Sequence, residues 1–117
     1  MIDEKAHDLG RLLGQTEEYK ALRRATDKLH EDVELQKQLG EMDKVAQQIQ
    51  MAGRSGQEPP APLIEQYERL FSTVQTHPVY QQLAVAQENF EKLMAKINEK
   101  IYDGIKKGAA SPIIQLS

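Results

Sequence analysis

Two carboxylate–histidine pairs have the spacing with which helices bind metal ions. Glu4 lies three residues before His7, and Asp27 lies three residues before His30. A carboxylate-x-x-His pair on each of two helices is half of the ligand set of a di-iron helical bundle. The ligands of a bundle metal must face inward, whereas both pairs lie off the apolar helix faces described below. We therefore interpret them as solvated residues and expect no metal site and no cofactor.

The remaining candidates for catalysis are poorly placed as well. His77 precedes Pro78 in a predicted turn, where it needs no catalytic role. The chain has no cysteine, which excludes disulfides, thiolate metal ligands and cysteine nucleophiles. No serine stands in a G-x-S-x-G motif, and neither a P-loop nor a G-x-G-x-x-G motif occurs. We predict that the protein is not an enzyme.

Two groups of basic residues could contact RNA or an acidic protein. The first comprises Lys20, Arg23, Arg24 and Lys28, and the second comprises Lys92, Lys96, Lys100 and Lys107. Acidic residues are interspersed in both groups, as on an ordinary solvated helix face, and aromatic platforms for base stacking are missing. Direct nucleic-acid binding is therefore not expected, and an RNA-binding helical module is the alternative function.

Composition favours a small helical protein that completes its core with a partner. The chain has 117 residues, enough for one domain, and contains two Phe and no Trp. Long helices with narrow apolar faces fit this composition, and such helices usually bury those faces against another subunit. The N-terminus lacks the apolar stretch of a signal peptide, and no apolar run reaches membrane-spanning length. We expect a soluble cytoplasmic protein.

Apolar residues spaced by three and four predict four helices. The first runs from Ile2 to Leu13, the third from Leu63 to Val74 and the last from Tyr80 to Ile105. The second begins at Tyr19, but its apolar face shifts after Val33, which indicates a bend or a break near residues 30–34 with Asp32 as a possible N-cap. Because no Pro or Gly lies there, we expect a bent but mostly continuous helix.

The pattern of helices occurs twice, 61 residues apart and without gaps. The shift aligns YKALRRA (residues 19–25) with YQQLAVA (residues 80–86), and it aligns the preceding short helices and turns as well. We predict one all-α domain, residues 1–117, in which two short helix–long helix hairpins form an antiparallel helical bundle. The predicted parts are hairpin 1 (about 1–52), a Gly/Pro-rich linker (53–62), hairpin 2 (about 63–108) and a tail (109–117).

The last helix carries apolar residues beyond the reach of the first hairpin. The corresponding helix of the first repeat begins at Tyr19, and its apolar face shifts after Val33. We therefore expect nothing in the repeat to cover the final part of the apolar face of the last helix. We predict a homo-oligomer whose subunit interface contains Ile97, Ile101 and Ile105. The apolar tail residues Ile113 and Ile114 either join this interface or fold back over the same strip.

Several segments together resemble the YlbF/YmcA family of small bacterial helical proteins. They are T-E-E-Y-K-A-L-x-x-A (16–25), D-x-E-L-Q (32–36), the Gly/Pro linker, H-P-V-Y-x-x-L (77–83) and the F-x-x-L-M-x-x-I run (90–97). The likeness covers about residues 2–107, and the short cysteine-free form is most similar to the YheA branch. Relatives often have Asp-Pro where this chain has Asp32-Val33.

The resemblance implies an all-helical, oligomeric cytoplasmic protein without enzymatic activity. Better-known members of the family join a complex that assists ribonuclease Y in messenger-RNA processing and influences competence, sporulation and biofilm formation. That complex holds iron–sulfur clusters through cysteines, which this chain does not have. The expected function is that of a protein–protein interaction or regulatory factor, with possible partners in an RNA-processing complex.

Overall fold

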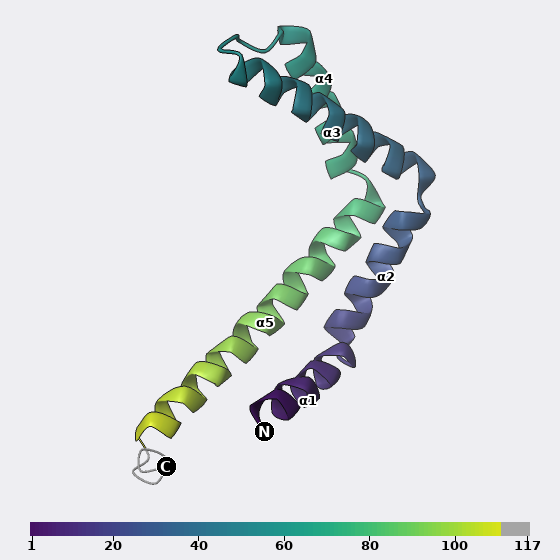
Figure 1. Ribbon diagram of the computed structural model, residues 1–117. Helices are drawn as coiled ribbons and strands as arrows, with labels where there is room; N and C mark the ends of the chain where they lie inside the picture. The colour runs from purple at the N-terminus through teal and green to yellow at the C-terminus, as the bar shows by residue number, and fades with distance from the viewer. Residues whose placement is uncertain (111–117) are drawn as a thin grey trace.

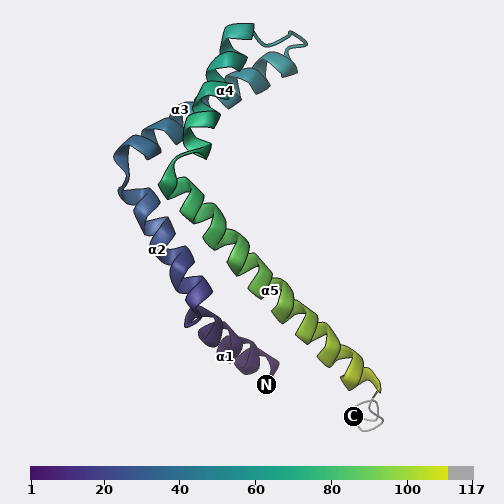
Figure 2. The same cartoon turned by 180° about the vertical axis from the view of Figure 1, so that it is seen from behind.

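The computed structural model describes residues 1–110, which form five α-helices and no strand. The helices are α1 (Ile2–Gly14), α2 (Glu17–Glu31), α3 (Val33–Arg54), α4 (Ala61–Gln75) and α5 (Pro78–Ala110) (Figure 1). The predicted all-α class is confirmed for these residues. Both views of the molecule place the N-terminus and the end of α5 at the same end of the structure (Figure 2).

The turns after α1 and α4 have the same hydrogen bonds, 61 residues apart. The backbone N–H of Thr16 donates to Leu13 O at 3.2 Å, and that of His77 donates to Val74 O at 3.1 Å. The Thr16 hydroxyl then accepts from the backbone N–H three residues on, at 3.2 Å, while Nδ1 of His77 accepts from the N–H of Val79 at 3.1 Å. Both side chains satisfy a free N–H in the first turn of the next helix. The sequence repeat is therefore also a repeat of backbone structure.

The second predicted helix is divided at Asp32, so the prediction of a mostly continuous helix was wrong. Asp32 has extended backbone angles (φ −86°, ψ 95°), and its Oδ1 accepts from the backbone N–H of Leu35 at 2.9 Å. The amide of Gln36 donates across the break to Leu29 O at 3.0 Å. These bonds satisfy backbone groups on both sides of the break, which lets the chain change direction without Pro or Gly.

Helix α2 packs antiparallel against the first half of α5, residues 78–92, and we call these segments the central pair. The rings of Tyr19 and Phe90 lie 5.7 Å apart at one end, and the side chains of Asp32 and His77 meet at the other. These contacts are thirteen residues apart on both helices, so the pairing is in register. Between them lies a small core of Ala25, Leu83 and Ala86, with Leu22 and Leu29 packed against it.

Helices α3 and α4 form a second antiparallel pair, which we call the closed arm (Figure 1). Its buried residues are Leu35, Val45 and Val74, and Leu35 is fully buried. The connection between the two helices is short and contains Gly56, whose φ of 74° lies in the left-handed region that favours glycine. This connection lies within the predicted linker.

The antiparallel pairs join helices from different repeats. The short and long helices of one repeat follow each other around a bend, whereas α2 packs on α5 and α3 packs on α4 (Figure 1). A helix in either repeat thus buries its apolar face mainly against the other repeat. The repeats are interlocked, and each supplies one helix to each pair.

The molecule is elongated and has little interior. Its principal extents are 66 × 36 × 19 Å, and its radius of gyration is 21.8 Å. A compact chain of this length has a radius of gyration of roughly 13 Å. Its accessible surface is 9395 Å², whereas a compact monomer of the same mass exposes about 6,450 Å². The chain therefore exposes about 2,900 Å² more than a compact monomer of its size.

Candidate interaction surface

The end of the molecule that carries the N-terminus is not closed by helix packing. There α1 runs beside the second half of α5, residues 93–110, and we call these two segments the open arm (Figures 1 and 2). No Cα atom of α1 lies within 8 Å of a Cα atom of α5. The two helices therefore face each other without forming the close contact seen in the closed arm.

Exposed apolar side chains are concentrated on the open arm. None of the six buried apolar residues of the described chain belongs to it. Together with Met1, which directly precedes α1, it contributes six of the twelve large apolar side chains that are exposed: Met1, Ile2, Leu12, Ile101, Tyr102 and Ile105. Single exposed apolar residues are ordinary on a protein surface, whereas a group of them on one element indicates a contact site.

Between the two helices of the open arm lies an apolar hollow of about 360 Å³. From α1 and the residue before it, the hollow is lined by Met1, Ile2, Lys5, Ala6 and Leu9. Ile101 lines it from α5. An open hollow with apolar walls is suited to receive apolar side chains of another helix.

The residues predicted for a subunit interface occupy this arm. Ile97 is partly buried, whereas Ile101 and Ile105 are 46% and 57% exposed. The exposures of Ile101 and Ile105 are those expected if the first repeat does not cover this end of α5. The subunit interface itself stays a prediction. Ile113 and Ile114 lie outside the described residues.

A second hollow, of about 540 Å³, runs along one side of the central pair. Ala21, Ala25 and Ala86 lie in its lining, and Arg24 and Lys28 contribute positive charge. No acidic residue lines it.

Of the other predicted basic residues, Lys92 pairs with Glu88 at 3.4 Å between mostly exposed side chains. Such surface ion pairs contribute about 0–1 kcal/mol to stability, so this one adds little to the stability of the fold.

Both carboxylate–histidine pairs that were considered as metal ligands lie on the surface of the protein. Glu4, His7, Asp27 and His30 are all exposed. Across residues 1–110 no three metal-binding side chains come together. Among these helices, none is both long and apolar enough to cross a membrane.

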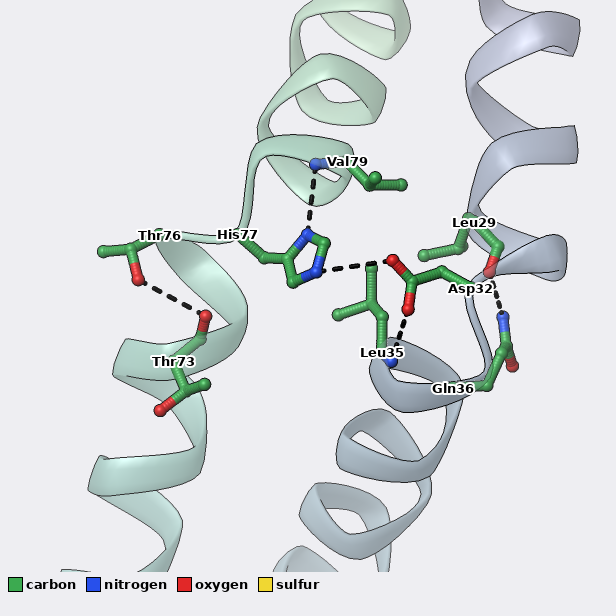
Figure 3. Close-up of polar contacts among 8 residues, drawn as sticks. All are labelled: Leu29, Asp32, Leu35, Gln36, Thr73, Thr76, His77 and Val79. Carbon is green, nitrogen blue, oxygen red and sulfur yellow. Dashed lines mark hydrogen bonds and ion pairs between the residues drawn. The ribbon is translucent and has the colours of Figure 1, made fainter.

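His77 instead contacts Asp32 where the helices of the two repeats meet (Figure 3). The sequence indicates Asp32 as a possible cap and places His77 in a turn, but the local pattern does not predict that the two side chains meet. The signal was available, because both are capping positions and the repeat implies that the turns of antiparallel helices are neighbours. The apolar hollow was missed for another reason: α1 was expected to pack within its own hairpin.

These features define a class of small, elongated, all-helical proteins with exposed apolar faces suited to helix contacts. The chain belongs to the YlbF/YmcA family, described as control of competence regulator ComK, whose family model matches residues 2–106. It is similar to a UPF0342 protein of Bacillus velezensis, with 28% identity over 98 residues, which is 84% of each chain. It is also similar to a UPF0342 protein of Bacillus licheniformis, with 24% identity over 111 residues, or 95% of each chain. No solved structure matches the chain.

Proposed function

We propose that this protein is a non-enzymatic regulatory factor that acts in the cytoplasm by contacting other proteins, including a second copy of itself. The open arm is the observation that carries this proposal, because it concentrates exposed apolar residues and contains none of the buried ones. Covering such a face releases water from apolar surface, which favours association. The family to which the chain belongs is described as control of the competence regulator ComK, and this description supports a regulatory role.

More specifically, the protein assists messenger-RNA processing by a ribonuclease as one component of a complex. The resemblance to better-known YlbF/YmcA proteins supports this step, and the match to the family model extends over nearly the whole chain. The iron–sulfur role of those relatives is not part of the proposal, because this chain has no cysteine to bind a cluster.

Affinity purification from the native cells tests the proposed function. The tagged protein is purified from its own cytoplasm, and mass spectrometry asks whether a ribonuclease and its associated proteins are recovered with it. We expect enrichment of the ribonuclease over a tag-only control. The variant Ile101→Lys/Ile105→Lys, changed on the open arm, tests whether recovery depends on that arm. Recovery of no ribonuclease component by the native protein contradicts the specific role.

The second candidate function is direct RNA binding in the hollow along the central pair. This hollow has two cationic residues, Arg24 and Lys28, and no acidic residue in its lining. Electrophoretic binding at physiological salt distinguishes the two functions. The contact-regulator proposal expects no retarded RNA. If RNA is retarded, the variant Arg24→Glu/Lys28→Glu tests whether it binds in the hollow along the central pair. Charge reversal of Lys92, Lys96 and Lys100 tests whether it binds on the basic face of α5.

A further inference from the structure

The hollow along the central pair is lined by one continuous stripe of residues from each helix. On α2 the stripe follows the spacing of three and four that defines one helix face, with Ala21, Arg24, Ala25 and Lys28. On α5 it runs from Pro78 to Asn89. That length of α5 is about 17 Å, so the hollow can hold about three turns of another helix.

Small side chains form the floor of this hollow. Ala25 of α2 and Ala86 of α5 are each 6% exposed, and both belong to the core between the two helices. Val85, next to Ala86, is exposed and adds an apolar contact point to the lining. Because an alanine side chain ends at Cβ, a third helix on this floor can approach both helices closely. The shape is that of a groove which receives an amphipathic helix.

The positive charge of the hollow is not neutralised within the described part of the chain. Arg24 and Lys28 are exposed, and none of the ion pairs of residues 1–110 includes either of them. Lys20 of the same helix does not line the hollow, and it pairs with Glu17 at 4.0 Å. Arg24 and Lys28 are one helical turn apart, about 6 Å along the axis.

The register of the central pair places uncharged residues of α5 level with these cations. Tyr19 of α2 contacts Phe90 of α5. Counting from this contact along the two antiparallel helices brings Arg24 level with Val85, and it brings Lys28 level with Gln81. A carboxylate that enters the hollow from another molecule therefore meets two cations on α2 and no competing charge on α5.

We propose that the hollow along the central pair binds an acidic amphipathic helix of a partner protein. Two carboxylates of that helix, one turn apart, contact Arg24 and Lys28, and its small and apolar residues lie on Ala25, Ala86 and Val85. The bound helix and the central pair then form a three-helix bundle. This inference rests on the proposed function, contact with other proteins, and it specifies the surface and the chemistry of one partner.

The distribution of charge favours a short acidic helix over a nucleic acid. Glu17 lies four residues before Ala21, and Glu31 lies three residues after Lys28, so acidic residues continue the α2 stripe at both ends. A phosphate backbone that extends beyond the two cations meets these carboxylates. Among the described residues that line the hollow none is aromatic, so bases have no stacking surface. A helix with two carboxylates one turn apart needs only the two cations.

Binding of a designed peptide, followed by fluorescence anisotropy, tests the proposal. The probe is a fluorescent helical peptide of about four turns with two glutamates one turn apart on an alanine-rich face. Two control peptides have two glutamines or two lysines in place of the glutamates. We expect the native protein to bind the glutamate peptide with a dissociation constant of about 100 μM, as in a small transient interface. The glutamine peptide should bind about 10-fold more weakly.

Two charge reversals on α2 provide a matched pair of variants. Arg24→Glu/Lys28→Glu changes the hollow, whereas Lys20→Glu/Arg23→Glu makes the same change in net charge outside it. The first should weaken binding of the glutamate peptide about 10-fold or more, and it should bind the lysine peptide instead. The second should stay within about twofold of the native protein, because the altered charges do not line the hollow. Circular dichroism should show native helix content in both.

A third variant separates the shape of the hollow from its charge. Ala21→Leu keeps every charge and fills part of the hollow, and leucine is nearly as good a helix former as alanine. We expect it to weaken binding of the glutamate peptide about 10-fold, because the third helix can no longer approach closely. Native affinity in this variant would show that the peptide does not lie in the hollow, which contradicts the proposal.

Other results would overturn the proposal as well. No binding of the glutamate peptide at about 1 mM protein, or equal binding of the glutamine peptide, removes the acidic partner. Equal losses from the two charge reversals would mean that the net charge of α2 attracts the peptide. Binding of an oligouridylate that depends on Arg24 and Lys28, without peptide binding, makes the hollow an RNA site. A smaller mass of Arg24→Glu/Lys28→Glu in sedimentation would assign the hollow to a second copy.

The peptide test and the affinity purification fail independently. Recovery of a ribonuclease by the native protein, without peptide binding, would refute the acidic helix while retaining the proposed function. Peptide binding in the hollow without recovery of a ribonuclease would retain the docking surface and remove the specific role in messenger-RNA processing.

Discussion

Nε2 of His77 lies 3.4 Å from Oδ2 of Asp32, and each residue caps the helix that follows it (Figure 3). Asp32 separates α2 from α3, and Thr76 and His77 separate α4 from α5. The contact therefore joins the two bends at which the closed arm leaves the central pair. Both side chains are only 25% exposed, so the contact is partly shielded from solvent.

The hydrogen bonds of His77 select one tautomer of its ring. Nδ1 accepts a hydrogen bond from the backbone N–H of Val79, so this nitrogen carries a lone pair and no proton. In the neutral ring the proton is then on Nε2, which faces the Asp32 carboxylate. One imidazole thus caps α5 with one nitrogen and donates toward the cap of α3 with the other.

A double-mutant cycle measures the coupling between the two bends. We expect Asp32→Ala to lower the free energy of unfolding by about 0.5–2 kcal/mol through loss of the α3 cap, and His77→Ala to have an effect of similar size on α5. The double variant should be less destabilised than the sum, by about 0.5 kcal/mol, because both single changes remove the same contact. Urea unfolding at one protein concentration provides the three values.

Asp32→Asn is the control for this cycle. Asparagine is as good an N-cap as aspartate, so this variant retains the bond to the Leu35 N–H while it removes the charge facing His77. We expect it to be less destabilised than Asp32→Ala. Equal losses for the two variants would mean that the cap contributes nothing, and strictly additive losses in the cycle would mean that the bends are not coupled.

Nitrogen NMR of the histidine rings tests the tautomer directly. At a pH where His77 is neutral, we expect long-range ¹H–¹⁵N correlations to show a protonated Nε2 and an unprotonated Nδ1. His7 and His30 are exposed and serve as internal references in the same spectrum. A protonated Nδ1 in neutral His77 would rule out its role as the α5 cap.

Two glycine substitutions should have opposite effects on stability. Gly40 lies within α3 with nothing near the position of an added Cβ, so Gly40→Ala should stabilise the protein by about 0.5–1 kcal/mol. Gly56 has φ of 74°, which alanine adopts only with strain, so Gly56→Ala should destabilise it by about 1 kcal/mol. Thermal unfolding of both variants checks the signs, and a stabilised Gly56→Ala would contradict the left-handed turn.

The small core of the closed arm makes Leu35 a sensitive position. Its side chain is fully buried, so Leu35→Ala should cost about 2–5 kcal/mol of unfolding free energy. Leu12 is 63% exposed, and Leu12→Ala should change stability by less than about 0.5 kcal/mol. Denaturant unfolding of the two variants at the same low protein concentration compares them. A loss from Leu35→Ala no larger than that from Leu12→Ala would show that the closed arm does not pack as described.

The sequence by itself determined the helices and the turns that start them. Apolar spacing gave the all-α class, and the caps Thr16 and Asp32 are local signals because their side chains bond to backbone within three residues. The 61-residue repeat was visible for the same reason, since each repeat carries its own local pattern. The lack of catalytic motifs was likewise a property of residue types and spacing.

Only the tertiary structure decided how the helices pair and where apolar surface is left. Whether the chain bends or breaks at Asp32 depends on packing on both sides, because the capping carboxylate permits a break and the residues around it do not require one. Pairing across the repeats brings His77 to Asp32, which lie 45 residues apart in the chain. The open arm arises in the same way: its apolar pattern matches that of the closed arm, and a helix face becomes a core or a binding surface only according to what packs on it.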